Sequence, residues 1–276
     1  MIDLSGYTLN NRHKVLARRC AKTQILWLGF NNTLGLKNYD YLIADKNLIN
    51  KNEENMYKEK ILFLPKIWNV LSLPNNLPLI SDEKIKNNLF TFGSFNNFKK
   101  ISNDTIEVWS TILRESNTRI ILKNSFPDSE ELKNNIYNKF IKQGVKEKQI
   151  IFLDREQNEE DHYRHYNKIN LALDTFPYPG VTTTFESILM GVPVLTMNGF
   201  NFNSRCGASI NKNIDMLDLI AKNNDDYISI AKKLSADNEL HLRNGNKLRD
   251  KAINSSLFDT KNFAKDFEKL LNEILN

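Results

Sequence analysis

Short apolar runs alternate with amphipathic stretches over the second two-thirds of the sequence, and this alternation constrains the fold more than any other feature. The apolar runs occupy residues 89–95, 119–124, 149–154, 169–175 and 193–199. Strands that alternate with helices predict a parallel sheet with helices on both of its faces. We therefore expect a complete, doubly wound α/β domain from residue 88 to about residue 255.

After residue 203 the pattern is helical up to the C-terminus, and the last segment, 261–275, is amphipathic. Its apolar side chains form one stripe at helical spacing, namely Phe263, Phe267, Leu270, Leu271 and Ile274. This stripe predicts a terminal helix that packs its phenylalanines inward, with the first part of the chain as a candidate surface for it.

The first 75 residues contain too few elements for a complete domain of this kind. Three strand candidates lie at 23–30, 39–45 and 61–67, and one helix-like segment lies at 11–20. We interpret residues 1–75 as the closing part of one α/β domain, which lies on the acceptor side in the interpretation below. A polar segment with prolines, 76–87, is then a linker, and residues 88–276 form the second domain.

The sequence DTFPYPGVTTTFESILMGVP, residues 174–193, reads as the end of a buried strand, a tight loop and a helix. We expect the helix to begin at Thr182 or Thr183 and to end at Gly191. A helix N-terminus at the carboxyl end of a parallel strand is a favourable place for an anion. The threonines also fit a second interpretation, as ordinary helix caps that need no ligand.

Composition narrows the class of protein. No apolar run is long enough to cross a membrane, and the N-terminus lacks the hydrophobic region of a signal peptide. The cysteines Cys20 and Cys206 lie far apart, without metal-like spacing. The net charge of +5 comes with lysines scattered among acidic residues, whereas nucleic-acid-binding proteins gather basic residues on one face. We therefore expect a soluble cytoplasmic protein without a nucleic-acid or membrane partner.

Several motifs together resemble the catalytic region of the O-GlcNAc transferase and SPINDLY family of glycosyltransferases. They are DLSGYT, QILWLGFNNTLGLKNYDYLIAD, FGSFNNFKKI, LALDTFPYPGVTTTFESILMGVPVLTM, SRCGAS and LIAKNNDDY, and they run colinearly over nearly the whole chain. The resemblance implies an α/β fold of GT-B type, with a complete C-terminal Rossmann-like domain that binds the nucleotide-sugar donor. The anion at the helix N-terminus is then the diphosphate of a UDP- or GDP-sugar.

The resemblance also assigns residues to the diphosphate. Lys100 matches the family's diphosphate-contacting lysine, and Asn97 falls where the family has a polar residue. Thr182 and Thr183 lie at the helix N-terminus, where backbone N–H groups and the helix dipole favour negative charge. From the sequence alone, Lys100 fits equally an ordinary solvated lysine ahead of the following helix.

Two further residues are assigned to the nucleoside. His162 matches a histidine that stacks against the nucleobase, although an isolated histidine in such a short helix most often faces solvent. Glu186 matches an acidic residue that accepts hydrogen bonds from the ribose hydroxyls. Glu186 also forms a Thr-x-x-Glu pattern with Thr183, which is the signature of a capping box.

The implied activity is an inverting transfer of N-acetylglucosamine or fucose to protein serine or threonine hydroxyls. The sequence contains no Asp-x-Asp motif, so we expect a metal-independent reaction without a cofactor. Thr33 and Gly35 are expected on the acceptor side of the cleft, and both also fit a simple turn. We assign no general base. The alternative is a nucleotide-sugar-binding remnant without transferase activity, and whether this chain alone is active is left open.

Overall fold

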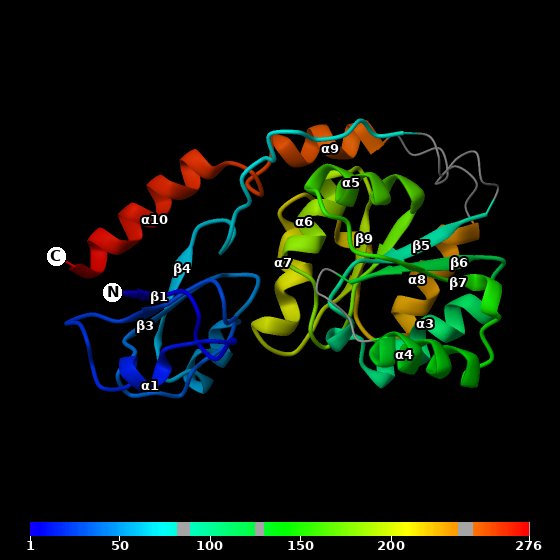
Figure 1. The fold of residues 1–276 in the computed structure, drawn as a ribbon. Helices are drawn as coiled ribbons and strands as arrows, with labels where there is room; N and C mark the ends of the chain where they lie inside the picture. Colours follow the sequence, from blue (N-terminus) through cyan, green and yellow to red (C-terminus); the bar gives the residue numbers. More distant parts are fainter. Residues whose placement is uncertain (82–88, 125–129, 237–244, 276) are drawn as a thin grey trace.

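The computed structural model describes residues 1–81, 89–124, 130–236 and 245–275, and it contains two parallel sheets (Figure 1). The first sheet has the order β1-β2-β3-β4. Its strands are β1 (Ile2–Asp3), β2 (Ile25–Leu26), β3 (Tyr41–Asp45) and β4 (Lys60–Leu64). Every pairing is parallel, which confirms the three strands expected in the first 75 residues. The sequence did not predict β1, because two residues are too short for a periodic pattern.

The second sheet has six parallel strands in the order β10-β9-β8-β5-β6-β7. They are β5 (Thr91–Ser94), β6 (Arg119–Lys123), β7 (Ile150–Leu153), β8 (Leu171–Leu173), β9 (Val194–Met197) and β10 (Ile220–Ala221). All five expected strands are confirmed. The expectation of a purely helical chain after residue 203 is wrong at β10, another two-residue edge strand that leaves no periodic signal.

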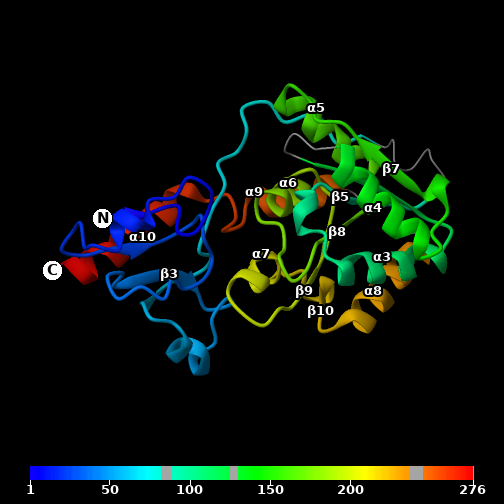
Figure 2. The ribbon, with the colours of Figure 1, turned by 60° about the horizontal axis from the view of Figure 1, so that its bottom comes forward.

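Helices cover both faces of this second sheet (Figures 1 and 2). One layer contains α3 (Asn103–Arg114), α4 (Glu130–Lys142) and α8 (Asn224–Ala236). The other contains α5 (Glu159–Arg164), α6 (Thr182–Leu189), α7 (Cys206–Lys212) and α9 (Gly245–Ile253). The amphipathic sequence of α3 illustrates why these segments fold as they do, since it buries Ile106, Trp109 and Ile112 at helical spacing.

The strand order reverses between β5 and β8. From β5 the chain moves outward through β6 to β7, then returns to β8 on the other side of β5 and continues to β9 and β10. At such a switch point the loops after the two central strands leave toward opposite faces of the sheet and open a crevice at the carboxyl ends. This topology therefore places the loop after β5 beside the loop after β8.

The terminal helix α10 (Thr260–Leu275) leaves the second domain and lies along the first sheet (Figures 1 and 2). The ring of Phe263 on this helix stacks on that of Trp27, with 6.0 Å between the ring centres. The ring centre of Phe267 lies 4.5 Å from that of the same tryptophan. The apolar stripe of α10 packs against Ile25, Ile43, Leu62 and Leu64 of the first sheet. The expected inward packing of the phenylalanines is confirmed. The division at residues 75 and 88 stays a prediction, with α10 as a C-terminal segment that packs on the N-terminal sheet.

Polar contacts also join the domain that contains the first sheet to the domain that contains the second. Arg205, at the end of a short 3-10 turn (Asn203–Arg205), donates to both carboxylate oxygens of Glu53 and to the carbonyl oxygen of Leu48. Ser209 of α7 donates a 2.8 Å hydrogen bond to the buried carboxylate of Asp45, at the end of β3. The start of α7 therefore docks on the carboxyl ends of the first sheet.

Candidate functional site

The loops after β5 and β8 are joined at the switch point by a partly buried chain of hydrogen bonds. Thr183 Oγ1 donates to Asn96 Oδ1 over 2.9 Å, and Asn96 Nδ2 donates to Asp174 Oδ1 over 3.1 Å. Asn96 lies two residues after the end of β5, Asp174 directly follows β8, and Thr183 lies in the first turn of α6. Three segments that are distant in sequence therefore meet at the place that the parallel topology predicts for a ligand.

Asp174 organises the loop that precedes α6. Its carboxylate accepts hydrogen bonds from the backbone N–H of Gly180 and the hydroxyl of Thr196, each over 2.7 Å. Burial raises the pKa of Asp174 to about 6, although these hydrogen bonds and the nearby charge of Lys100 act in the opposite direction. The carboxylate thus holds the chain between the strand and the helix in one conformation.

Lys100 lies at the end of a 3-10 turn (Phe98–Lys100) and reaches the same loop. Its Nζ donates to the carbonyl oxygen of Pro179 over 2.8 Å and lies 4.1 Å from the ring centre of Tyr178. Partial burial lowers the pKa of the Lys100 ammonium, and the carboxylate of Asp174 opposes that shift. Lys100 is therefore a fixed positive group beside the α6 loop, and the interpretation as a freely solvated lysine is wrong.

Helix α6 begins at Thr182, as expected, but no side chain caps it. Its N-cap residue is Val181, and the helix has no side-chain cap hydrogen bond. The hydroxyl of Thr183 is directed instead to Asn96, while Thr182 is exposed in the first turn. The capping-box interpretation of Glu186 therefore does not hold, and the first N–H groups of α6 have no intrahelical acceptor.

The carboxylate of Glu186 turns toward a cluster of polar side chains on the neighbouring elements. His162 of α5 lies with its Nε2 3.0 Å from Glu186 Oε2, and the hydroxyl of Tyr166 donates to the same oxygen over 2.9 Å. On its other side, His162 Nδ1 lies 2.8 Å from the Nζ of Lys123, at the end of β6. The side chains of His162 and Glu186 are 16% and 14% exposed, so both reach the surface of the site.

Other predicted residues are held elsewhere. The side chain of Asn97 accepts the backbone N–H of Lys99 and caps the 3-10 turn. In the first domain, Thr33 Oγ1 donates to Glu59 over 2.5 Å and accepts the N–H of Gly35, whose φ of +67° is left-handed. All three lie in loop segments, and their roles toward a donor or an acceptor stay predictions.

Sequence reasoning missed four members of the site, Asn96, Asp174, Lys123 and Tyr166. Three of them carried a signal, and Tyr166 carried none. Asp174 and Lys123 are charged residues at the ends of apolar runs, where parallel strands present side chains to a ligand. Asn96 stands beside Asn97 in the same motif, and only the fold decides which of the two asparagines turns toward α6.

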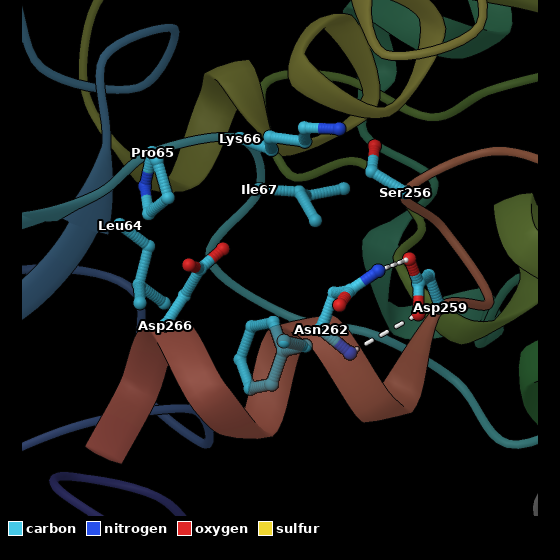
Figure 3. Close-up of a pocket in the computed structure, with 9 residues that line it drawn as sticks. Leu64, Pro65, Lys66, Ile67, Ser256, Asp259, Asn262 and Asp266 are labelled. Carbon is cyan, nitrogen blue, oxygen red and sulfur yellow. Dashed lines mark hydrogen bonds between the residues drawn. The ribbon is translucent and has the colours of Figure 1, made fainter. Parts of the chain in front are cut away.

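Away from the switch point, a pocket lies between the end of β4 and α10 (Figure 3), and none of its lining residues belongs to the switch-point loops. Asn262 donates two hydrogen bonds to Asp259 there, one from its backbone and one from its side chain. Those polar groups thus stabilise the start of α10.

Within residues 1–81, 89–124, 130–236 and 245–275, no group of three or more His, Cys, Asp and Glu side chains is arranged to hold a metal ion. No helix of the described segments is long and apolar enough to span a membrane.

The two parallel-sheet domains have the fold of glycosyltransferases of GT-B type. A sucrose-phosphate synthase from Thermosynechococcus elongatus shares the fold, with a TM-score of 0.66 over 95% of this chain and 70% of that one, at 12% identity. A mutant of the O-GlcNAc transferase from Thermobaculum terrenum superposes with a TM-score of 0.90 and 28% identity, covering 99% of this chain and 52% of that one.

The sequence matches are more specific. The model of glycosyl transferase family 41 matches residues 1–88 and 79–267, so the chain belongs to this family and the resemblance is confirmed. The probable UDP-N-acetylglucosamine–peptide N-acetylglucosaminyltransferase SPINDLY of Eustoma exaltatum subsp. russellianum is 33% identical over 97% of this chain. The Arabidopsis thaliana protein SEC, named as the same type of transferase, is 27% identical over 98% of this chain. The chain spans 29% and 28% of the length of these two relatives.

Proposed function

We propose that this chain binds a UDP- or GDP-sugar at the switch point of its second sheet and transfers the sugar to serine or threonine hydroxyls of proteins. The sugar is N-acetylglucosamine or fucose, and the transfer inverts the anomeric configuration. The names of the relatives, which describe probable peptide N-acetylglucosaminyltransferases, support the substrate class. The proposed site of action is the cytoplasm.

The observation that carries the proposal is the meeting of Lys100 with the N-terminus of α6. Lys100 is fixed at the loop of Pro179, which leads directly into the first turn of the helix. An ammonium group and free backbone N–H groups beside one another suit a diphosphate, because both donate to anionic oxygens. Glu186 and His162 lie along the same helix and its neighbour, where the attached nucleoside would extend.

The mechanism that follows uses fixed positive groups. An acceptor hydroxyl attacks the anomeric carbon on the face opposite the diphosphate. A bond forms from the hydroxyl oxygen to that carbon, the bond from the carbon to the diphosphate oxygen breaks, and the hydroxyl proton is released to solvent. Lys100 and the α6 dipole stabilise the negative charge that develops on the leaving diphosphate. In this proposal the reaction needs neither a metal ion nor another cofactor. Thr33 and Gly35 lie on the acceptor side, and no general base is assigned.

Calorimetric titration of the chain with UDP and GDP, each in the presence of a chelator, tests the donor site. We expect one of the two nucleotides to bind without added metal. Incubation with radiolabelled UDP-N-acetylglucosamine or GDP-fucose and a protein acceptor then tests transfer. Binding without transfer would favour the remnant, while absence of binding to both nucleotides would refute the site. Binding that requires manganese or magnesium would refute the metal-free mechanism.

A further inference from the structure

Lys123 is a lysine in an unusual place. It ends β6, its exposed fraction is 2%, and burial lowers the pKa of its ammonium. Its Nζ lies 2.8 Å from Nδ1 of His162, within hydrogen-bonding distance. Long charged side chains are rarely buried to this extent without a specific partner.

The chemistry of lysine fixes the direction of hydrogen bonds through His162. An ammonium group has only donors, so His162 Nδ1 must accept and carries no proton. In the neutral imidazole the proton is then on Nε2, which donates to Glu186 Oε2 over 3.0 Å. Lys123 thus selects one of the two tautomers of His162, and that tautomer holds Glu186.

The same network divides the two oxygens of Glu186. Oε2 accepts from both His162 and Tyr166. Among the described residues, none donates to Oε1. The carboxylate is therefore anchored through one oxygen, and within the described parts of the chain its other oxygen is left to accept hydrogen bonds from a ligand.

We propose that Lys123 is a positioning residue for the nucleoside half of the donor. Lys123 sets the tautomer of His162, and His162 then holds Glu186 so that Oε1 faces the ribose hydroxyls. This inference rests on the proposed function, in which Glu186 accepts from the ribose and His162 stacks on the base. It adds a residue that touches neither group of the donor and acts through its neighbours.

A purely structural lysine would stabilise the fold without affecting one half of the ligand more than the other. The chain supplies a matched control for that case. Lys168 Nζ lies 3.2 Å from Nδ1 of His165, whose Nε2 lies 2.6 Å from Glu156 Oε1. This second Lys-His-Glu series has the same order of groups but does not include α6.

The experiment compares Lys123→Met, Lys123→Arg and Lys168→Met with the wild-type protein. Calorimetry measures the affinity for the nucleoside diphosphate that the wild-type protein binds, and separately for inorganic pyrophosphate. We expect Lys123→Met to lower the affinity for the nucleoside diphosphate about tenfold and to leave the affinity for pyrophosphate unchanged. Lys123→Arg keeps a hydrogen-bond donor and should retain most of the nucleotide affinity. Lys168→Met should bind both ligands with wild-type affinity.

Nitrogen-15 NMR of the histidine rings, at an alkaline pH where free imidazole is neutral, reports the tautomer directly. The wild-type His162 should carry its proton on Nε2, and Lys123→Met should populate both tautomers. A wild-type His162 protonated on Nδ1 would overturn the proposal even if Lys123→Met did not fold. The proposal would also be overturned if Lys123→Met lowered the affinities for nucleotide and pyrophosphate equally, or left nucleotide binding unchanged. In both cases the proposed function would stand. A wild-type protein that binds pyrophosphate but no nucleotide would refute the proposed function itself and, with it, the role of Lys123.

Discussion

The amine of Lys100 donates a 2.8 Å hydrogen bond to the carbonyl oxygen of Pro179, 79 positions further along the chain. This bond joins the loop after β5 to the loop that leads into α6. A ligand that binds between these loops meets an ammonium group whose position is already fixed. Such preorganisation reduces the entropy cost of binding an anion.

Replacement of Lys100 by alanine is expected to weaken diphosphate binding. The variant loses a charge-assisted contact of about 1.5–3 kcal/mol, so nucleotide affinity should fall about ten- to a hundredfold. Because the amine also bonds Pro179, we expect a loss of stability of about 1 kcal/mol. Lys99→Ala is the control, since Lys99 is exposed next to it. Equal nucleotide affinities for the two variants, measured by calorimetry, would contradict the assignment.

Gly180 is expected to tolerate no side chain. A Cβ atom there would lie 2.4 Å from Thr183 Oγ1 and 2.7 Å from Asn96 Oδ1, so these partners would have to separate. Gly180→Ala should therefore disturb the start of α6 and lower nucleotide affinity by at least about tenfold. Gly144→Ala is the control, because it lies outside the proposed site and its Cβ would meet only the side chain of Arg114, at 3.3 Å, although its left-handed φ adds about 1 kcal/mol of strain. Calorimetry on both variants checks this, and normal nucleotide binding by Gly180→Ala would count against it.

The sequence was sufficient for the parallel architecture because both periodicity and the Pro-Gly loop are local signals. The five strands of the second sheet and the start of α6 at Thr182 follow from such signals. The contacts between residues across the switch point do not follow from local signals. The sequence cannot show that Thr183 bonds Asn96 rather than capping its own helix, because the choice depends on a loop 87 positions away.

The same limit explains why the roles of Lys123 and Asp174 in the site were not predicted from the sequence. Each ends an apolar run, so the sequence places both at the carboxyl edge of the sheet. Their partners, His162 and Gly180, come from elements whose distance is set only when the helices pack on the sheet. Residue roles that depend on tertiary distances therefore required the structure, whereas the fold class did not.

The pair formed by Arg205 and Glu53 is expected to stabilise the contact between the two domains. The guanidinium group of Arg205 lowers the pKa of Glu53 to about 2, from its ordinary value of 4.5. A lowered carboxylate pKa adds stability that is present above about pH 4.5 and is lost as the pH falls through about 2. Glu53→Gln should cost about 2–3 kcal/mol at neutral pH.

Urea denaturation of the wild-type protein and Glu53→Gln over this range measures the contribution of the Arg205–Glu53 pair. The difference between their unfolding free energies should shrink toward acidic pH. Glu54→Gln is the control, since that neighbouring carboxylate forms no ion pair with any described residue. A difference that stays constant from pH 7 to pH 2 would mean that the ion pair does not stabilise the fold.

Asp45 is expected to give the opposite pH dependence. Burial raises its pKa from 3.8 to about 6, so the folded state keeps a proton that the unfolded state loses between these values. Stability therefore decreases by about 1–3 kcal/mol as the pH rises through this window and is constant above it. Asp45→Asn removes the titration. Urea denaturation should show the wild-type protein losing stability relative to Asp45→Asn between pH 3.8 and about 6, and parallel curves would contradict the prediction.

The packing of α10 on the first sheet is expected to depend on Phe267. Its ring lies 4.5 Å from that of Trp27, and both belong to the cluster that covers β2, β3 and β4. Because Phe267 is only partly buried, Phe267→Ala should cost about 1–3 kcal/mol, less than a fully buried phenylalanine. The loss of this contact should also let water reach Trp27 and shift its fluorescence to longer wavelength. Lys269→Ala, an exposed position on the same helix, should change neither property. If Phe267→Ala left both the unfolding free energy and the tryptophan emission unchanged, the helix would not be held by this stripe.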